Sequence, residues 1–288
     1  MRKIDGISKH SRLEHVTKSV FEFSLQGEVF MKKLAIASAL LSALAVTGTA
    51  NAYQAEVGAS AGLIDPDNGS SSGSFGVDGT YYFNPVQTRN SPLAEAAFLD
   101  RASNVNAQFN YDEVGDAEAT KYGVGAEYYV PNSDFYVSGN VARQDIEYPN
   151  GADFDTTLYG AEIGYLPAPG LLIAAGLKGY DNDYDDGVDP TLRAKYVTTL
   201  SNGKAINLEA GAAFGDLDEF NLAADYFIDP SLSVGADYYN NDLNDNSEFG
   251  VSARKFFNQQ VSLEGRVGFG EVTSNDYNKF GLAAKYRF

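Results

Sequence analysis

Several residue types that commonly build chemical sites are scarce or absent in this 288-residue chain. It contains no cysteine and no tryptophan, and both of its histidines, His10 and His15, lie near the N-terminus. Without cysteine, an exported fold cannot depend on disulfides. Beyond the N-terminal stretch the chain also lacks the commonest general base and the commonest metal ligands. The sequence therefore predicts no enzyme, no cofactor and no metal site.

A long apolar run is also missing after residue 52, so no segment there predicts a membrane-spanning helix. Apolar residues instead recur at every second position, which predicts β-strands. A soluble antiparallel sheet gives the same alternation, but residues 276–288 exceed the roughly 9–11 residues that a tilted strand needs to cross a bilayer. From residue 280 to the end, one face of this stretch carries only apolar and aromatic side chains: Phe280, Leu282, Ala284, Tyr286 and Phe288.

The start of the chain predicts export. Lys32 and Lys33 precede an apolar run, 34–46, which is followed by a small-x-small cleavage site at 50–52. This order is typical of a secretory signal peptide over residues 31–52. The apolar run is too short for a transmembrane helix, and the cleavage site argues against one.

Residues 1–30 stand in front of a complete signal peptide. We interpret them as the product of a mis-called start codon, with Met31 as the true start. The exported chain is then residues 53–288, which we expect to form one domain. The whole chain has 21 basic and 39 acidic residues and a net charge of −18. Composition therefore predicts no nucleic-acid partner.

Fourteen candidate strands follow at spacings typical of an up-and-down meander. Tight turns rich in Pro, Asn and Gly follow the even-numbered strands, which predicts the periplasmic side, whereas the connections after odd-numbered strands are polar and acidic. The predicted fold is all-β, a transmembrane antiparallel up-and-down β-barrel of about 14 strands with both ends on one side. The candidate strands are 53–63, 73–83, 104–114, 119–130, 135–146, 155–166, 171–181, 190–200, 204–215, 218–228, 231–242, 247–257, 260–270 and 276–288.

One connection breaks this pattern. Residues 84–103 follow an even-numbered strand but are long, and Pro85 and Pro92 punctuate them. Residues 93–99 predict a short helix, with Ser91 as its N-cap and Pro92 as its first residue. Long structured connections are usually functional, so we expect this one to fold into or across the periplasmic mouth. A helix on the rim or a flexible surface turn is the alternative. The residues expected to form a constriction are Pro92, Leu93, Glu95, Phe98, Asp100 and Arg101.

The alternation also separates two faces of the predicted sheet. On the apolar face, aromatic residues gather near both strand ends, as at the two interfaces of a membrane. The other face carries charges, which must meet water or one another because a charge facing lipid costs roughly 2–4 kcal/mol. The residues predicted to line the lumen are Glu56, Asp78, Asp112, Lys121, Glu127, Glu162, Lys178, Arg193, Lys195, Glu209, Asp225, Asp237, Arg254, Glu264, Arg266, Lys279, Lys285 and Arg287.

These charges are unevenly distributed. The first six strands contribute mostly acidic residues, whereas basic residues concentrate in the seventh, eighth and last three strands. Opposed walls would set up a transverse field across a water-filled pore. Alternatively, the charges pair across a narrow lumen and largely fill it. Fourteen strands lie between small packed barrels and large open ones, which favours a narrow, partly obstructed channel. Closure is expected to set Glu56 beside Lys285 and Arg287.

The acidic stretch 181–189 resembles an oxygen-rich Ca²⁺ loop, but it lacks a closing Glu and a flanking helix pair. A solvated acidic loop beside divalent-bridged lipopolysaccharide is the favoured interpretation. The outer face offers no distinct trimer patch, which favours a monomer.

Three short stretches carry a family resemblance: Tyr-Phe-Asn-Pro-Val at 82–86, Pro-Leu-Ala-Glu-Ala-Ala-Phe-Leu at 92–99, and Ser-Asn-Val at 103–105. They resemble the small porins of Acinetobacter and related bacteria, the family of the 33–36 kDa outer-membrane protein. A weaker similarity extends over residues 53–288, and Ser91 stands where relatives carry Gly. The resemblance implies a monomeric outer-membrane β-barrel associated with solute uptake and antibiotic susceptibility. It also implies that Phe288 is the assembly signal read by the barrel-assembly machinery.

The expected function is passive diffusion of small hydrophilic solutes and ions through a narrow charged lumen, gated or narrowed by the connection at 84–103. The alternative is a largely closed structural or interaction barrel whose acidic loops contact host or envelope partners. Expected partners are outer-membrane lipid and lipopolysaccharide, the barrel-assembly machinery and small solutes. The expected location is the outer membrane of a Gram-negative cell, reached through a cleaved signal peptide.

Overall fold

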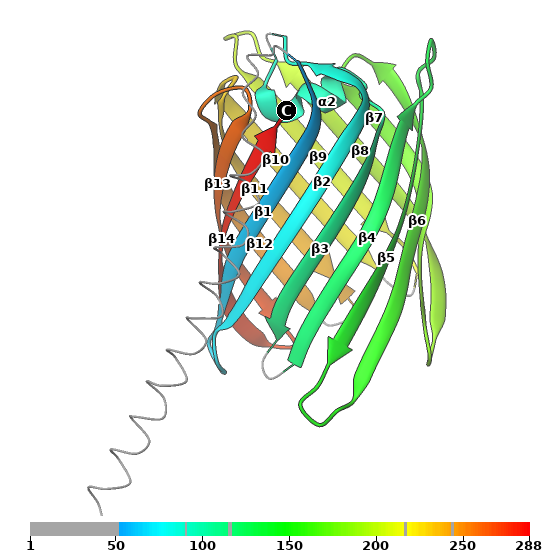
Figure 1. Ribbon diagram of the computed structural model, residues 1–288, viewed down its shortest axis with the longest axis vertical. Helices are drawn as coiled ribbons and strands as arrows, with labels where there is room; N and C mark the ends of the chain where they lie inside the picture. The colour runs from blue at the N-terminus through cyan, green and yellow to red at the C-terminus, as the bar shows by residue number, and fades with distance from the viewer. Residues whose placement is uncertain (1–51, 90, 115–116, 216–217, 243–244) are drawn as a thin grey trace, which may run out of the picture. The chain divides into compact units, whose positions relative to one another are not determined.

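Antiparallel strands close into a barrel, in which β1 (Ala52–Pro66) pairs with β2 (Ser72–Gln87) on one side and with β14 (Asn275–Arg287) on the other (Figure 1). The computed structural model describes residues 52–89, 91–114, 117–215, 218–242 and 245–288, all within one unit that spans residues 44–288. The predicted start extension, and the predicted signal peptide up to residue 51, lie outside the described residues.

The fourteen predicted strands are all present in the described part of the chain, and each pairs with its neighbours in sequence, so the predicted fold class is confirmed. Several strands run past their predicted ends, because backbone pairing continues where the apolar–polar alternation stops. The other strands are β3 (Asn104–Val114), β4 (Ala117–Tyr129), β5 (Phe135–Glu147), β6 (Asp153–Ala168), β7 (Leu171–Asn182), β8 (Asp186–Thr199), β9 (Ala205–Ala213), β10 (Glu219–Asp229), β11 (Leu232–Asn241), β12 (Asn246–Phe256) and β13 (Val261–Val272).

Two of these strand ends correct the sequence analysis. The acidic stretch 181–189 is mostly strand, because only residues 183–185 separate β7 from β8. β2 ends at Gln87, whereas its end was expected at residue 83. Its last residues pair only with β1, since β3 begins opposite Tyr82. Proline is tolerated where a strand has one neighbour, so Pro85 does not end β2.

The two faces of the sheet differ in what they expose. Large apolar side chains cover one face, as Val124, Ile163 and Leu282 show with exposed fractions of 57%, 61% and 63%. Cross-strand partners share a face, so Glu56 and its partner Arg287 lie together on the other face. Side chains on that second face contact the short helix inside the ring of strands, which identifies it as the inner face.

The connection between β2 and β3 forms that helix, a 3₁₀ turn η1 (Leu93–Glu95) followed by α2 (Ala96–Leu99). The predicted cap is wrong: Pro92 occupies the N-cap position, and no side chain caps η1. Ser91 instead donates its hydroxyl to the carbonyl of Thr88 at 3.0 Å. A helix this short derives its stability from packing rather than from its own hydrogen bonds. Within the described ranges, no helix has the length and hydropathy needed to cross a membrane.

Candidate functional site

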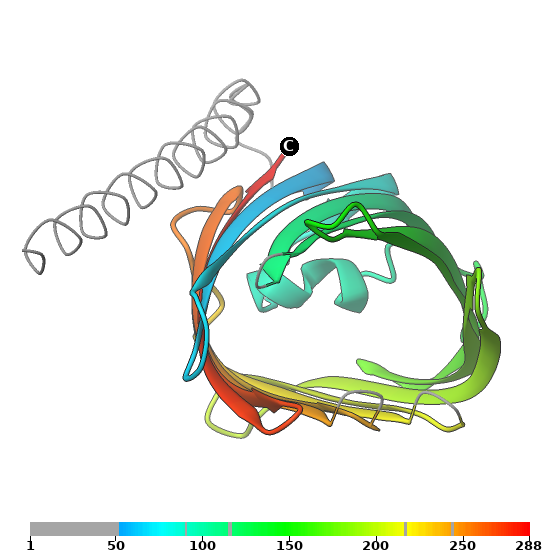
Figure 2. The same cartoon turned by 90° about the horizontal axis from the view of Figure 1, so that it is seen from below.

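The candidate site is the inner face of the barrel together with residues 88–103, termed the mouth segment. The barrel end that holds Ala52, Phe288 and this segment is termed the terminal end, and the opposite end the hairpin end. Figure 2, which looks in from the hairpin end, shows the helix of the mouth segment inside the ring of strands.

The mouth segment is tied to distant parts of the rim. The Leu93 amide donates to the carbonyl of Pro230 in the β10–β11 turn at 2.8 Å, and the Leu93 carbonyl accepts from Arg287 of β14 at 2.7 Å. Toward its other end, Arg101 pairs with Asp134 in the β4–β5 turn at 3.0 Å. Because these anchors belong to strands on different sides of the ring, the segment reaches across the terminal end.

An ion pair fixes the middle of the segment to β8. Glu95, only 6% exposed, lies 2.8 Å from the ammonium of Lys195, which also contacts Glu209 at 2.6 Å. The same ammonium lies 5.1 Å from the centre of the Phe98 ring. Removing one partner of a buried pair leaves an uncompensated charge, so Glu95 contributes strongly to the position of the helix.

Apolar packing holds the segment against β1–β7. Ala96 is fully buried, and Phe98 is partly buried. These contacts involve two clusters, Tyr53, Tyr82 and Val86 around Ala96, and Tyr129, Tyr136, Leu166 and Leu172 around Phe98.

We expect Phe98→Ala to loosen the segment while leaving the barrel folded. Loss of a partly buried ring costs about 1–2 kcal/mol, which accelerates amide exchange of residues 93–101 by roughly tenfold or more if the segment opens locally. Hydrogen exchange followed by mass spectrometry measures this. Unchanged exchange in the variant would show that the Phe98 contacts do not hold the segment.

The ends of the segment change direction sharply. Arg89 and Arg101 adopt φ angles of 28° and 51°, in the left-handed region that costs a non-glycine residue about 1–2 kcal/mol. Asp100 offsets part of this cost, because it pairs with Arg89 at 3.1 Å and accepts the Gln87 amide at 2.9 Å.

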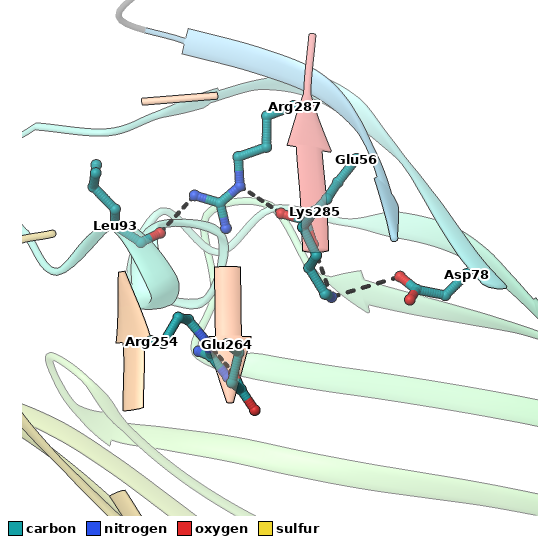
Figure 3. Close-up of polar contacts among 7 residues, drawn as sticks. All are labelled: Glu56, Asp78, Leu93, Arg254, Glu264, Lys285 and Arg287. Carbon is teal, nitrogen blue, oxygen red and sulfur yellow. Dashed lines mark hydrogen bonds and ion pairs between the residues drawn. The ribbon is translucent and has the colours of Figure 1, made fainter. Parts of the chain in front are cut away.

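Among the described residues, the most buried ion pair lies at the closure seam, where β1 pairs with β14 (Figure 3). Glu56 of β1 accepts from Arg287 and from Lys285 of β14, the latter at 3.1 Å. Lys285 also lies 3.5 Å from Asp78 of β2. The Arg287 guanidinium lies over the ring of Tyr53 at 4.5 Å, and its side chain is 5% exposed. Arg287 therefore links the seam of the barrel to the mouth segment.

A second network lies on β3–β8. Arg193 binds Glu162 at 2.7 Å, while Glu127 accepts from the Tyr136 hydroxyl at 3.1 Å and from the side-chain amide of Asn104 at 3.0 Å. The Tyr136 ring, beneath Phe98, thereby connects the inner-face charges to the mouth segment.

Further pairs continue toward the hairpin end. Arg266 binds both Asp237 and Glu248, and Glu248 also accepts from Tyr277 at 2.8 Å and lies 3.9 Å from Lys279. Lys178 also pairs with Glu219 at 2.6 Å toward the hairpin end, whereas Arg254 pairs with Glu264 near the terminal end.

Four predicted lumen residues have no ion-pair partner among the described residues: Asp112, Lys121, Glu127 and Asp225. Asp225 accepts from Asn207 at 3.1 Å, but no cation of the described chain lies within 4.0 Å of it. The same is true of Asp112, and Lys121 has no acidic partner at that distance among the described residues. Every other basic residue predicted to line the lumen has an acidic partner.

These pairs correct the picture of an acidic wall opposite a basic wall. They join strands that are one to three places apart in the barrel, as in Lys195 with Glu209, Arg193 with Glu162, and Arg266 with Asp237. Charges are therefore compensated along the wall rather than across the lumen. The contacts that do reach inward from the wall go to the mouth segment.

Sequence analysis missed Glu219 and Glu248 as inner-face acids. Both share the alternation of predicted lumen residues on their own strands, Asp225 and Arg254, so the period of two contained the signal. They lie near the hairpin end of β10 and β12.

Phe288 follows β14 and stays bonded to β1. Its carbonyl accepts from the amides of Gln54 and Ala55 at 2.8 and 2.9 Å, and its ring is 45% exposed. In the described residues, no group of three or more His, Cys, Asp or Glu side chains could hold a metal ion.

A closed fourteen-stranded barrel with an apolar outside, a charged inner face and a helix across one end defines a β-barrel of the porin class. The sequence matches the family described as "Putative general bacterial porin" over residues 31–186. The structure is similar to the crystal structure of the Acinetobacter baumannii outer membrane protein Omp33, with 30% identity and a TM-score of 0.66 over 82% of this chain and 99% of that one. The chain belongs to this porin family.

Two other channels share the fold alone. The CymD monoaromatic hydrocarbon channel is 9% identical, with a TM-score of 0.55 over 82% of this chain and 89% of that one. The TodX deltaS2S3 mutant monoaromatic hydrocarbon channel is 6% identical, with a TM-score of 0.51 over 83% and 90%. No curated protein sequence matches. Family membership and the barrel fold imply the outer membrane as location and point to a channel rather than an enzyme.

Proposed function

We propose that this porin mediates passive diffusion of small hydrophilic solutes and ions, with the terminal end facing the periplasm and the mouth segment as the constriction. The observation that carries the proposal is open space beside a segment that does not fill the lumen. A cavity of about 370 Å³ remains between the mouth segment and the ends of β6, β8 and β9. This corresponds to about twelve water molecules at roughly 30 Å³ each.

A second cavity, of about 290 Å³, lies against β1–β3. Its polar lining comes from small or amide side chains such as Ser60, Thr80, Asn106 and Gln108, together with Asp78. Hydroxyls and amides replace the hydration of a neutral solute without binding it tightly, as diffusion requires.

A closed structural barrel is the competing function, and the anchors of the mouth segment on β4–β5, β8 and β14 favour it. Planar-bilayer recordings of the full exported chain separate the two. We expect single-channel current steps with a preference for cations. Among the described residues, three predicted lumen acids, Asp112, Glu127 and Asp225, have no ion-pair partner, but only one predicted lumen cation, Lys121, has none. Silence from protein with a folded, heat-modifiable electrophoretic mobility would instead support the closed barrel.

A further inference from the structure

The hairpin end carries a cluster of exposed aromatic rings. The ring centre of Tyr148, in the β5–β6 connection, lies 5.8 Å from that of Phe154 of β6, and the two rings meet edge to face. The ring centre of Phe154 lies 5.6 Å from that of Tyr184 in the β7–β8 connection. Their exposed fractions are 44%, 42% and 80%. The β5–β6 hairpin extends beyond its neighbours at the lower end of Figure 1. Three contiguous rings thus stand in solvent on two adjacent hairpins.

These rings are not part of the aromatic belt that faces lipid. On the outer face of β5 and β6, the apolar side chains end at Tyr159, and the ion pair of Arg143 with Asp155 follows toward the hairpin end. Charges of this kind lie outside the hydrocarbon layer. Phe154 alternates with Asp155 and shares the inner face with Glu162, so the ring cluster borders the opening of the barrel at the hairpin end.

The backbone beneath the rings is held in place. Around Tyr148, its amide donates to the Ala152 carbonyl and its carbonyl accepts from the Gly151 amide, both at 2.9 Å. In the other hairpin, the Asn182 side chain accepts from the amides of Tyr184 and Asp185 at 2.9 and 3.0 Å. Rigid placement of rings lowers the entropic cost of binding a ligand between them.

The same hairpins are strongly acidic. Arg143 is the only basic residue in the ranges 143–155 and 181–189, and it is occupied by Asp145 and Asp155. The acidic residues of these ranges are Asp145, Glu147, Asp153, Asp155, Asp181, Asp183, Asp185, Asp186 and Asp189. The potential around the rings is therefore negative and attracts cations.

We infer that the Tyr148–Phe154–Tyr184 cluster is a binding site for small organic cations, such as quaternary ammonium compounds. A cation over an aromatic face is attracted by the ring quadrupole, and surrounding carboxylates add long-range attraction. A neutral apolar ligand would gain nothing from the acids, and a bare metal ion would gain little from the rings. Binding at this cluster does not require conduction; its role as a capture site for diffusing solutes rests on the proposed function.

Ligand-detected NMR on the full exported chain in detergent micelles tests the site, with choline as probe and its neutral isostere 3,3-dimethylbutan-1-ol as matched ligand. Choline is expected to bind more tightly than the isostere and to lose affinity as salt rises. Tyr184→Ala is expected to weaken choline binding roughly two- to fivefold, and loss of all three rings by roughly tenfold or more. Asp183→Asn with Asp185→Asn is expected to weaken choline binding and reduce its salt dependence.

Phe257→Ala is the matched control, because Phe257 is a 67% exposed ring in the β12–β13 turn at the opposite end; it should leave affinity unchanged. No choline binding, equal binding of both ligands, or full binding without the three rings overturns the inference. Bilayer conductance is scored separately. A barrel that binds choline but does not conduct supports this site and rejects the proposed function. A barrel that conducts but does not bind choline rejects this site and supports the proposed function.

Discussion

Replacing residues 91–100 with a Gly-Ser linker of equal length is expected to raise single-channel conductance about threefold or more, because ionic current is limited by the narrowest part of a pore. The replacement removes the Glu95–Lys195 pair, the Leu93 contacts with Pro230 and Arg287, and the Phe98 packing. Lys195 keeps Glu209 as a partner, so the wall itself stays compensated. Planar-bilayer recordings give the conductance, and heat-modifiable mobility in gels reports that the barrel is folded.

Glu95→Gln tests the ion pair with Lys195 separately from the rest of the mouth segment. It keeps the side-chain volume and removes the charge, so we expect more frequent openings of the channel rather than the full conductance of the linker variant. Asp153→Asn, which removes an exposed acid at the hairpin end, is the matched control and should leave the opening frequency unchanged. If the folded linker variant conducts like the parent, the mouth segment is not the constriction.

Arg287→Ala is expected to lower the free energy of unfolding by about 3 kcal/mol, because it leaves the Glu56 carboxylate buried with a weaker partner. Arg287 also holds the Leu93 carbonyl and lies against the rings of Tyr53 and Phe256. Lys285 remains near Glu56 and keeps the loss at the lower end of the range for a broken buried pair. Urea unfolding in detergent micelles, followed by tyrosine fluorescence, measures the change.

The pair Glu56→Gln with Arg287→Met provides the matching rescue. Replacing both members of a buried pair avoids the uncompensated charge, so most of the lost stability should return. Lys279→Ala is the control, since Lys279 is 39% exposed and 3.9 Å from Glu248, and its loss should cost no more than about 1 kcal/mol. If the Arg287→Ala and Lys279→Ala variants are equally stable, the ion pair between β1 and β14 does not stabilise the barrel as proposed.

The alternation of side chains determined the barrel. In β14, Phe280, Leu282 and Tyr286 lie on one face and Lys279 and Lys285 on the other, and a period of two is readable without any tertiary information. The same pattern in the other strands gave their number and placed most of the inner-face charges, and the spacings between the strands predicted the up-and-down order. Local residue chemistry also predicted the short helix between β2 and β3.

Two local signals, Pro85 as a strand end and Ser91 as a helix cap, predicted the wrong structure. Pro85 suggested the end of β2, yet β2 continues because its last residues need only β1 as a neighbour. Ser91 had the residue type of an N-cap, but Pro92 takes that position, and Ser91 bonds to Thr88 instead. For β2 the deciding partner is β1, which a local window does not contain, whereas the partner of Ser91 is the nearby carbonyl of Thr88.

By itself, the sequence determined that this chain forms a closed membrane barrel with a charged inner face and a structured connection after the second strand. Strand closure also predicted that Glu56 meets Lys285 and Arg287, whereas only the tertiary structure decided which of the other charges meet. Lys195 with Glu95, Arg193 with Glu162, and Arg287 with the Leu93 carbonyl depend on the stagger of the strands and on how the mouth segment crosses the ring. Alternation specifies which face a side chain occupies, whereas these contacts depend on its height along the barrel and on distance across the ring, which follow from closure.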